Sequence, residues 1–236
     1  MLSEHAATPI PTLRGTDWLA ALLASIAGAT DAIGILDFGR YSAHMSGTTS
    51  QTVAHALSGT GPVALGVLAI LCFVAGAALC GFVAEAFATR AARRTLSGLL
   101  ATEAILLAMA TTLLIAAPEP ILALTPMAFA MGLQNATSSR LLGPTIRTTH
   151  VTGTLTDLGD ALGAMAQNSS PRRRAALADV ASRKGLLFCA FAGGGALGGA
   201  GYVWIGPFTL FAAAALSGLA ALALARSGRA GTAARS

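Results

Sequence analysis

Six long apolar runs constrain the fold of this chain more than any other feature of its sequence. A helix needs roughly 20 mainly apolar residues to cross the roughly 30 Å hydrocarbon core of a bilayer, where its backbone must satisfy its own hydrogen bonds. The runs therefore predict an all-α, polytopic membrane protein with six transmembrane helices. They cover residues 18–36, 62–84, 98–117, 121–139, 185–205 and 207–225.

Composition agrees with a membrane domain, because only 11% of the residues are charged. A soluble globular domain carries roughly 25%. Residues 1–17 and 226–236 are expected to form short tails. No positive segment and cleavage site frame the first run, so we expect it to remain as a helix. The cysteines Cys72, Cys80 and Cys189 lie inside apolar runs, which predicts reduced thiols.

The basic residues predict the orientation of the chain. Six spans place all of the 15 lysine and arginine residues except Arg40 on one side of the membrane. The positive-inside rule then puts both termini in the cytoplasm. The run Arg172–Arg173–Arg174 is interpreted as a topology signal with some attraction for anionic lipid. It lacks interleaved aromatic residues and a known binding module, so no nucleic-acid partner is expected.

The chain also repeats itself at an offset of about 106 residues. The stretch HMSGTTSQ at 44–51 matches HVTGTLTD at 150–157, with a shared His-x-(Ser/Thr)-Gly-Thr core. Upstream, Asp31 corresponds to Asn135, and downstream FVAGAALCG at 73–81 matches FAGGGALGG at 191–199. Because each copy holds three spans, the second enters from the opposite face. The repeat therefore predicts two inverted three-helix units, 18–117 and 118–225, each with a short extra motif helix.

Both motifs are too polar to face lipid. Gly47 and Gly153 permit a tight bend or a close backbone approach, and the hydroxyls that follow are expected to cap a helix beginning there. Two interpretations stay open: a re-entrant segment in a protein-lined cavity, or a capped helix at the membrane surface. Two motifs that enter from opposite faces would point their helix N-termini at a central anion or polar group.

Polar residues inside the spans supply the candidate site. A charge such as that of Asp31 costs at least about 2.5–3.5 kcal/mol in the membrane, so it should not face lipid. It could bind a cation, carry a proton or hold a solute, or it could accept hydrogen bonds from a neighbouring helix or from the paired motif. Replacing Asp31 with Asn is expected to abolish ion-coupled uptake while leaving insertion intact.

The neutral pair Gln134 and Asn135 has two interpretations, a solute site or hydrogen bonds between helices. His44 and His150 could relay protons, or each could bond to the turn that follows it. No spacing typical of a zinc site surrounds them. The candidate solute or ion pathway comprises Asp31, His44, Ser46, Gly47, Thr48, Gln51, Gln134, Asn135, His150, Thr152, Gly153, Thr154 and Asp157.

Small residues predict where helices approach closely. Gly194 and Gly198, overlapping with Gly195 and Gly199, form Gly-x-x-x-Gly spacings in the fifth run. Ala77 and Gly81 are the counterpart in the second run, and such faces let helix backbones pack together.

The stretches around Asp31, 44–51, Asn135 and 149–156 resemble the signature segments of the YoaK-like family of bacterial multi-pass membrane proteins, a family of unknown function. The resemblance covers residues 18–225. The family usually shows Met-Thr-Gly-Asn-Thr in the first motif, where this chain has Ser46 and Thr48 in the Thr and Asn places. The resemblance implies the fold and a bacterial inner-membrane location, and it supplies no substrate, reaction or site.

These features favour a secondary transporter or permease for a small polar or ionic solute. The alternatives are a membrane scaffold or regulator that transports nothing, and an intramembrane enzyme that uses Asp31 or a histidine. No nucleophile elbow or phosphate-binding loop supports the enzyme, so no catalytic residue, cofactor or metal is expected. The expected partners are the lipid bilayer and an unidentified solute, and self-association into a homo-oligomer stays open.

Overall fold

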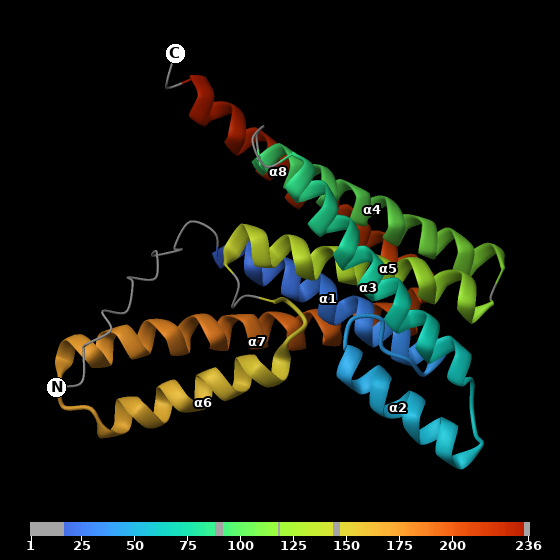
Figure 1. The fold of residues 1–236 in the computed structure, drawn as a ribbon, viewed down its shortest axis with the longest axis horizontal. Coiled ribbons are helices and arrows are strands. Elements are labelled where there is room, and N and C mark those ends of the chain that lie inside the picture. Colours follow the sequence, from blue (N-terminus) through green and yellow to red (C-terminus); the bar gives the residue numbers. More distant parts are fainter. Residues whose placement is uncertain (1–16, 88–91, 118, 144–146, 234–236) are drawn as a thin grey trace.

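The computed structural model describes residues 17–87, 92–117, 119–143 and 147–233, and in these ranges the chain is helical with short connections. The predicted N-terminal tail lies almost wholly outside them. No strand occurs in the described ranges, so the all-α prediction is confirmed (Figure 1). The helices are α1 (Asp17–Phe38), α2 (Met45–Ser58), α3 (Val63–Ala86), α4 (Ala92–Ala116), α5 (Pro120–Leu142), α6 (Val151–Gln167), α7 (Pro171–Ile205), the 3₁₀ turn η1 (Gly206–Phe208) and α8 (Thr209–Ala233).

Four helical stretches are long and apolar enough to cross a membrane. Three are essentially α1, α3 and α4, and the fourth, Pro171–Arg226, contains α7, η1 and most of α8. The helix α5 does not qualify, because its second half carries Gln134, Asn135 and several hydroxyls, most of them buried in the protein. The protein is therefore suited to a membrane, while the count of six spans stays a prediction.

Each predicted run lies within a helix or nearly so, but α7 begins well before residue 185. The added segment is charged and still helical, since Arg and Ala are good helix formers. Two ion pairs support it: Arg183 Nη2 lies 3.0 Å from Asp179 Oδ2, and Lys184 Nζ lies 2.7 Å from Asp157 Oδ2 of α6. The helices α6 and α7 consequently run side by side as a hairpin (Figure 1).

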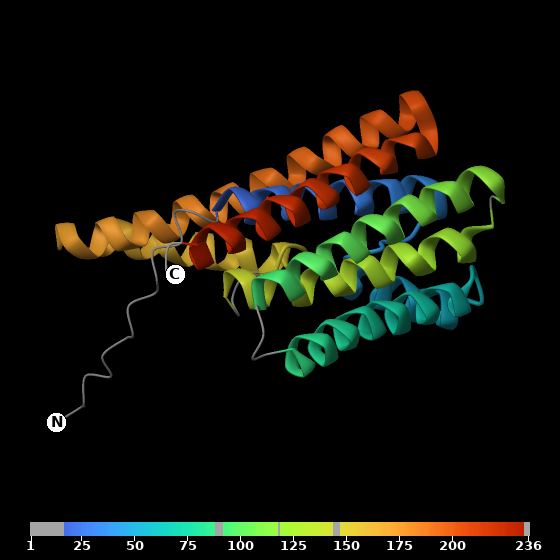
Figure 2. The ribbon, with the colours of Figure 1, turned by 90° about the horizontal axis from the view of Figure 1, so that it is seen from above.

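The two halves of the chain are interlaced. The four most extensive helix pairs are α1 with α7, α3 with α5, α4 with α8, and α4 with α5. Each pair joins a helix of the first half to one of the second. Figure 2 shows α7 and α8 as a hairpin, and Figure 1 shows α2, α3 and α8 inclined to α6 and α7. Leu23, Leu107, Met127 and Leu210 are fully buried between them.

Glycines bring the paired helices into backbone contact at two places, which we call the α1–α7 seam and the α3–α5 seam. A methyl group at Gly28 would overlap the carbonyl oxygen of Phe191, and one at Gly194 would overlap that of Ser25. The α3–α5 seam repeats this arrangement: a methyl group at Gly132 would overlap the carbonyl of Phe73, and one at Gly76 that of Phe129. Small residues thus set the distance between these helices.

Candidate functional site

The loop before α2 is held by the carboxylate of Asp31. After α1 the chain turns at Gly39, whose φ of +63° suits a residue without Cβ. Asp31 Oδ1 then accepts hydrogen bonds from the backbone N–H of Ala43 at 2.6 Å and from Ser42 Oγ at 3.4 Å. The Asp31 side chain is buried, so these contacts supply polar partners that lipid cannot.

The loop before α6 is held in the same way by an amide. Asn135 Oδ1 accepts hydrogen bonds from the backbone N–H of Thr149 at 3.3 Å and from Thr148 Oγ1 at 3.4 Å. Asn135 Nδ2 donates to Thr149 Oγ1 at 2.8 Å. The neighbouring Gln134 is fully buried, and its Nε2 donates to Leu23 O at 2.9 Å and to Thr148 Oγ1 at 2.8 Å.

Each motif helix starts directly after its histidine. The His44 ring lies against Gly47 and the His150 ring against Gly153, where a Cβ atom would collide with the ring. The expectation that the motif hydroxyls cap these helices is wrong, because neither helix has a side-chain cap in the described chain. Thr48 Oγ1 instead donates back to Tyr41 O at 3.0 Å. Neither N-cap histidine therefore accepts a hydrogen bond from the first backbone amides of its helix.

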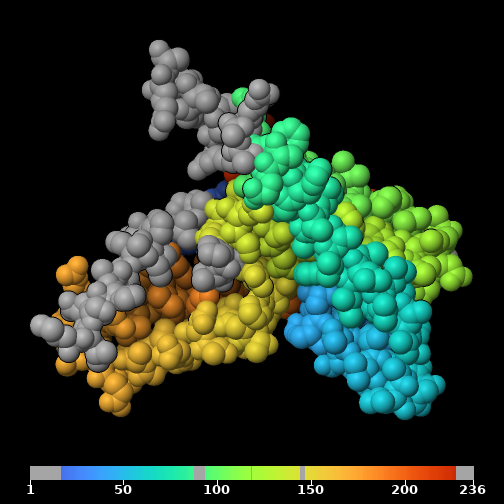
Figure 3. All heavy atoms as spheres, viewed as in Figure 1, coloured from blue at the N-terminus to red at the C-terminus, as the bar shows by residue number. Residues whose placement is uncertain are grey.

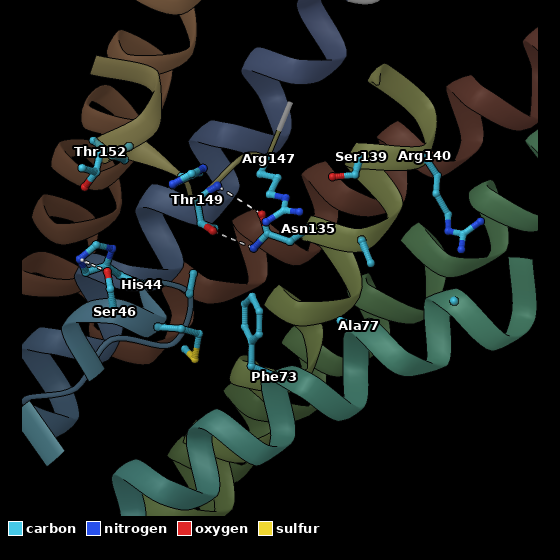
Figure 4. A pocket seen from close by; sticks show the side chains of 16 residues that line it. His44, Ser46, Phe73, Ala77, Asn135, Ser139, Arg140, Arg147, Thr149 and Thr152 are labelled. Carbon is cyan, nitrogen blue, oxygen red and sulfur yellow. Dashed lines mark hydrogen bonds between the residues drawn. The ribbon is translucent and has the colours of Figure 1, made fainter. Parts of the chain in front are cut away.

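The two helix starts border one cavity of about 880 Å³, with α3 and α5 as its other walls. In the space-filling view the surface is hollowed between α6 (yellow) and α2 (blue) (Figure 3). Figure 4 shows Asn135, Arg147 and Thr149 on one side of this cavity and His44 with Ser46 on another. Its polar lining consists of His44, Ser46, Asn135, Ser139, Arg140, Arg147, Thr149, His150 and Thr152.

The structure divides the predicted pathway residues into two groups. His44, Ser46, Asn135, His150 and Thr152 line the cavity. The others lie around it: Asp31, Thr48, Gln134 and Thr154 are buried, Gly47 and Gly153 lie beneath the histidine rings, Gln51 is half-buried on α2, and Asp157 is exposed and paired with Lys184. Asp31 itself does not line the cavity, but its carboxylate accepts from the backbone of Ala43 and His44, which do.

Two lining residues, Arg140 and Arg147, were not among the predicted site residues, because the sequence presents them only as topology signals. Arg140 follows Ala136 by four residues on α5 and so shares the face of that helix that lines the cavity. Its Nη1 lies 3.1 Å from Glu85 Oε1, a solvent-exposed pair that contributes little. Arg147 makes no ion pair within the described residues.

The two seams differ beside this cavity. A methyl group at Gly199 of the α1–α7 seam would contact Ala32 and Leu36, each at 3.7 Å. A methyl group at the corresponding Gly81 of the α3–α5 seam would have no neighbour within 4 Å, and Gly81 lines the cavity. At the end of the α1–α7 seam, the Tyr202 hydroxyl donates to Asp37 Oδ1. We call the α3–α5 seam the open seam, because it faces the cavity at Gly81, and the α1–α7 seam the closed seam. The two seams occupy equivalent places in the two copies of the repeat.

An all-helical protein with apolar helices of membrane-spanning length, folded around a cavity between two repeated motifs, is the class that the fold and the site define. Within that class, the chain belongs to the family described as protein of unknown function (DUF1275), which it matches over residues 19–223. The family resemblance drawn from the sequence is thereby confirmed. No curated protein and no solved structure matches the chain.

Proposed function

We propose that this protein is a secondary transporter or permease for a small polar or ionic solute in the bacterial inner membrane. The observation that carries the proposal is the meeting of both motif helices at one cavity. Non-helical backbone inside a membrane is tolerated where it lines such a cavity. Transporters of inverted-repeat architecture bind their solutes between broken helices in this way.

The proposal includes six spans in two inverted units. The stretch Pro171–Arg226 is 56 residues long, and a helix of that length would measure about 84 Å, more than twice the hydrocarbon core. The turn at Gly206, with φ of +63°, divides it into two spans. The polar half of α5 faces other helices, so that helix serves as the sixth span. Both termini then lie in the cytoplasm, on the side of Arg140 and Arg147.

The difference between the seams supports alternating access. In an inverted repeat, exchanging the conformations of the two halves turns a cavity that opens to one side into one that opens to the other. The open α3–α5 seam and the closed α1–α7 seam fit an inward-facing state. Closing the first at Gly81 and opening the second at Gly199 would expose the same motifs to the outside.

The test is labelling of cavity cysteines from each side of the membrane. Ser46→Cys and Thr152→Cys are made singly in a chain whose three native cysteines are replaced by Ala, and a membrane-impermeant maleimide is added to right-side-out or inside-out vesicles. A transporter exposes each cysteine to both sides in turn, with faster reaction from the cytoplasmic side. Thr60→Cys and Ser169→Cys, in the α2–α3 and α6–α7 connections, are controls that react from one side each.

The outcome separates transport from its alternatives. Reaction of both cavity cysteines from one side only would favour the scaffold, because a fixed cavity has one entrance. Reaction of Ser46→Cys only from outside and Thr152→Cys only from inside would place the motif helices at opposite surfaces and remove the proposal.

A further inference from the structure

We propose that the cavity takes a small anion; this inference rests on the proposed function and names the class of its solute. The charged side chains that line the cavity are Arg140 and Arg147, and no carboxylate lines it within the described residues. A cavity whose formal charges are all positive produces a positive potential that favours a negatively charged occupant.

The acidic groups nearby do not neutralise this lining. Asp31 is buried and does not line the cavity, and its carboxylate is occupied by hydrogen bonds from Ser42 Oγ and from the backbone N–H groups of Ala43 and His44. Glu85 pairs with Arg140, but the Glu85 side chain is 75% exposed, so solvent screens most of that interaction. Arg147, with no ion pair among the described residues, remains as a guanidinium able to bind an oxyanion with two hydrogen bonds.

The two helix starts add to the same preference. Each helix N-terminus carries a partial positive charge and backbone N–H groups without intrahelical acceptors. Here both starts border one cavity, and neither N-cap histidine caps its helix, although the Asp31 carboxylate accepts from the backbone N–H groups of Ala43 and His44 just before α2. Ser46, Thr149 and Thr152 offer hydroxyl donors beside them. Donors at two helix starts and two arginines thus border a volume of about 880 Å³, within the usual range for small ligands.

The anion has two sources, a free solute and the headgroup of an anionic lipid, which share this chemistry. The experiment uses the full-length protein in nanodiscs of phosphatidylcholine and follows its thermal unfolding while inorganic phosphate, sulfate or acetate is added at constant ionic strength. A ligand that binds only the folded state raises the unfolding temperature in a saturable way. The lipid arm repeats the measurement in discs containing phosphatidylglycerol.

We expect at least one of the three anions to stabilise the protein, and Arg147→Gln to weaken its apparent affinity by roughly tenfold or more, as for a lost charge-assisted contact. Arg140→Gln should also weaken the apparent affinity for the anion, and it replaces Arg147→Gln in the test if that variant fails to fold. Arg226→Gln is the matched control, because Arg226 is exposed on α8 and outside the cavity. Arg147-dependent stabilisation by phosphatidylglycerol, with no further effect of phosphate, would assign the anion to a lipid headgroup.

Failure of this inference is distinguishable from failure of the proposed function. One contrary result is stabilisation by glycerol, or by choline against an equal concentration of sodium chloride, that is lost in Asn135→Ala. If the anions and phosphatidylglycerol then have no effect, the preference for an anion is overturned while the cavity remains a solute site. An equal anion effect in wild type and Arg147→Gln would also overturn it. No response to any probe, combined with cysteine labelling from one side only, would overturn both.

Discussion

At the scale of single residues, Asp31 and Asn135 hold two loops by equivalent contacts although one is an acid and the other an amide. Each places one oxygen toward a backbone N–H and a hydroxyl of its loop. The contact of Asp31 with Ala43 N is 2.6 Å long, and that of Asn135 with Thr149 N is 3.3 Å long. Both residues therefore position a cavity wall.

This geometry predicts different effects of two substitutions at Asp31. An amide oxygen in Asp31→Asn still accepts from Ala43, so we expect an unfolding temperature near that of the wild type. Asp31→Ala leaves the Ala43 N–H and Ser42 hydroxyl buried without this acceptor, which costs about 1–3 kcal/mol. Thermal unfolding of both variants in nanodiscs measures the difference. Equal destabilisation by Asn and Ala would show that the charge itself holds the loop.

At the scale of helices, backbone contact at the glycines fixes both seams. The contacts leave no space for a methyl group at Gly28, Gly194, Gly76 or Gly132. Apolar burial alone gives little drive for helix association in lipid, so close packing contributes much of the stability of such seams.

Two adjacent glycines of α7 provide a test of that statement. Gly194→Ala would push a methyl group into the carbonyl of Ser25, and overpacking of this kind typically costs about 1–3 kcal/mol. Gly193→Ala meets nothing within 4 Å and replaces Gly by a better helix former, so it should leave stability unchanged or slightly raised. Thermal unfolding in nanodiscs compares the two. A destabilisation shared equally by both variants would contradict the seam.

Much of this element-level architecture follows from the sequence. Apolar runs and the prolines or glycines between them predicted the helices, and the hydroxyls after Gly47 and Gly153 predicted helices starting at the motifs, although those hydroxyls do not cap them. The start of α7 was missed because residues 171–184 are charged, and their helical order comes from packing against α6 and from pairs such as Lys184 with Asp157. The periodicity of apolar residues along the sequence does not predict contacts of this kind between helices.

The candidate site was predictable only in part. The repeat singled out His44, His150 and Asn135, which do line a common cavity. For Asp31 it left hydrogen bonds to the paired motif open beside a role in transport, because an acid suggests several roles in isolation; the structure shows bonds to the loop before the motif helix. Arg140 and Arg147 were read only as topology signals, since their place beside the motifs depends on how α3 packs against α5. Whether such residues line a cavity depends on contacts between helices that are far apart in the sequence.

At the scale of the whole molecule, the two seams differ in state although they correspond in sequence. The α1–α7 seam is packed as far as the Tyr202–Asp37 hydrogen bond, whereas the α3–α5 seam opens to the cavity at Gly81 and is bridged beyond it by the exposed Glu85–Arg140 ion pair. If the protein alternates between these arrangements, contacts at the end of each seam set the balance between inward-facing and outward-facing forms.

Removal of the Tyr202 hydroxyl should shift that balance. In Tyr202→Phe the end of the α1–α7 seam loses its bond to Asp37, and one exposed hydrogen bond contributes roughly 0.5–1 kcal/mol. We therefore expect labelling of Gly199→Cys from outside to rise about two- to fivefold, measured in right-side-out vesicles of the chain without native cysteines. The rate at Ser169→Cys should stay constant. An unchanged rate at Gly199→Cys would mean that this bond does not restrain the seam.

The interlacing of the halves has a consequence for how the chain must be assembled. The first helix of each half packs against a helix of the other half, α1 against α7 and α5 against α3. Neither half alone therefore contains the helix surface that covers its own first helix. A protein divided between Ala117 and Glu119 would yield two fragments, each with its main seam residues exposed to lipid and open to proteolysis when produced alone. Produced together in one cell, the same fragments would supply each other's missing partners and recover a folded complex, as two obligate subunits do.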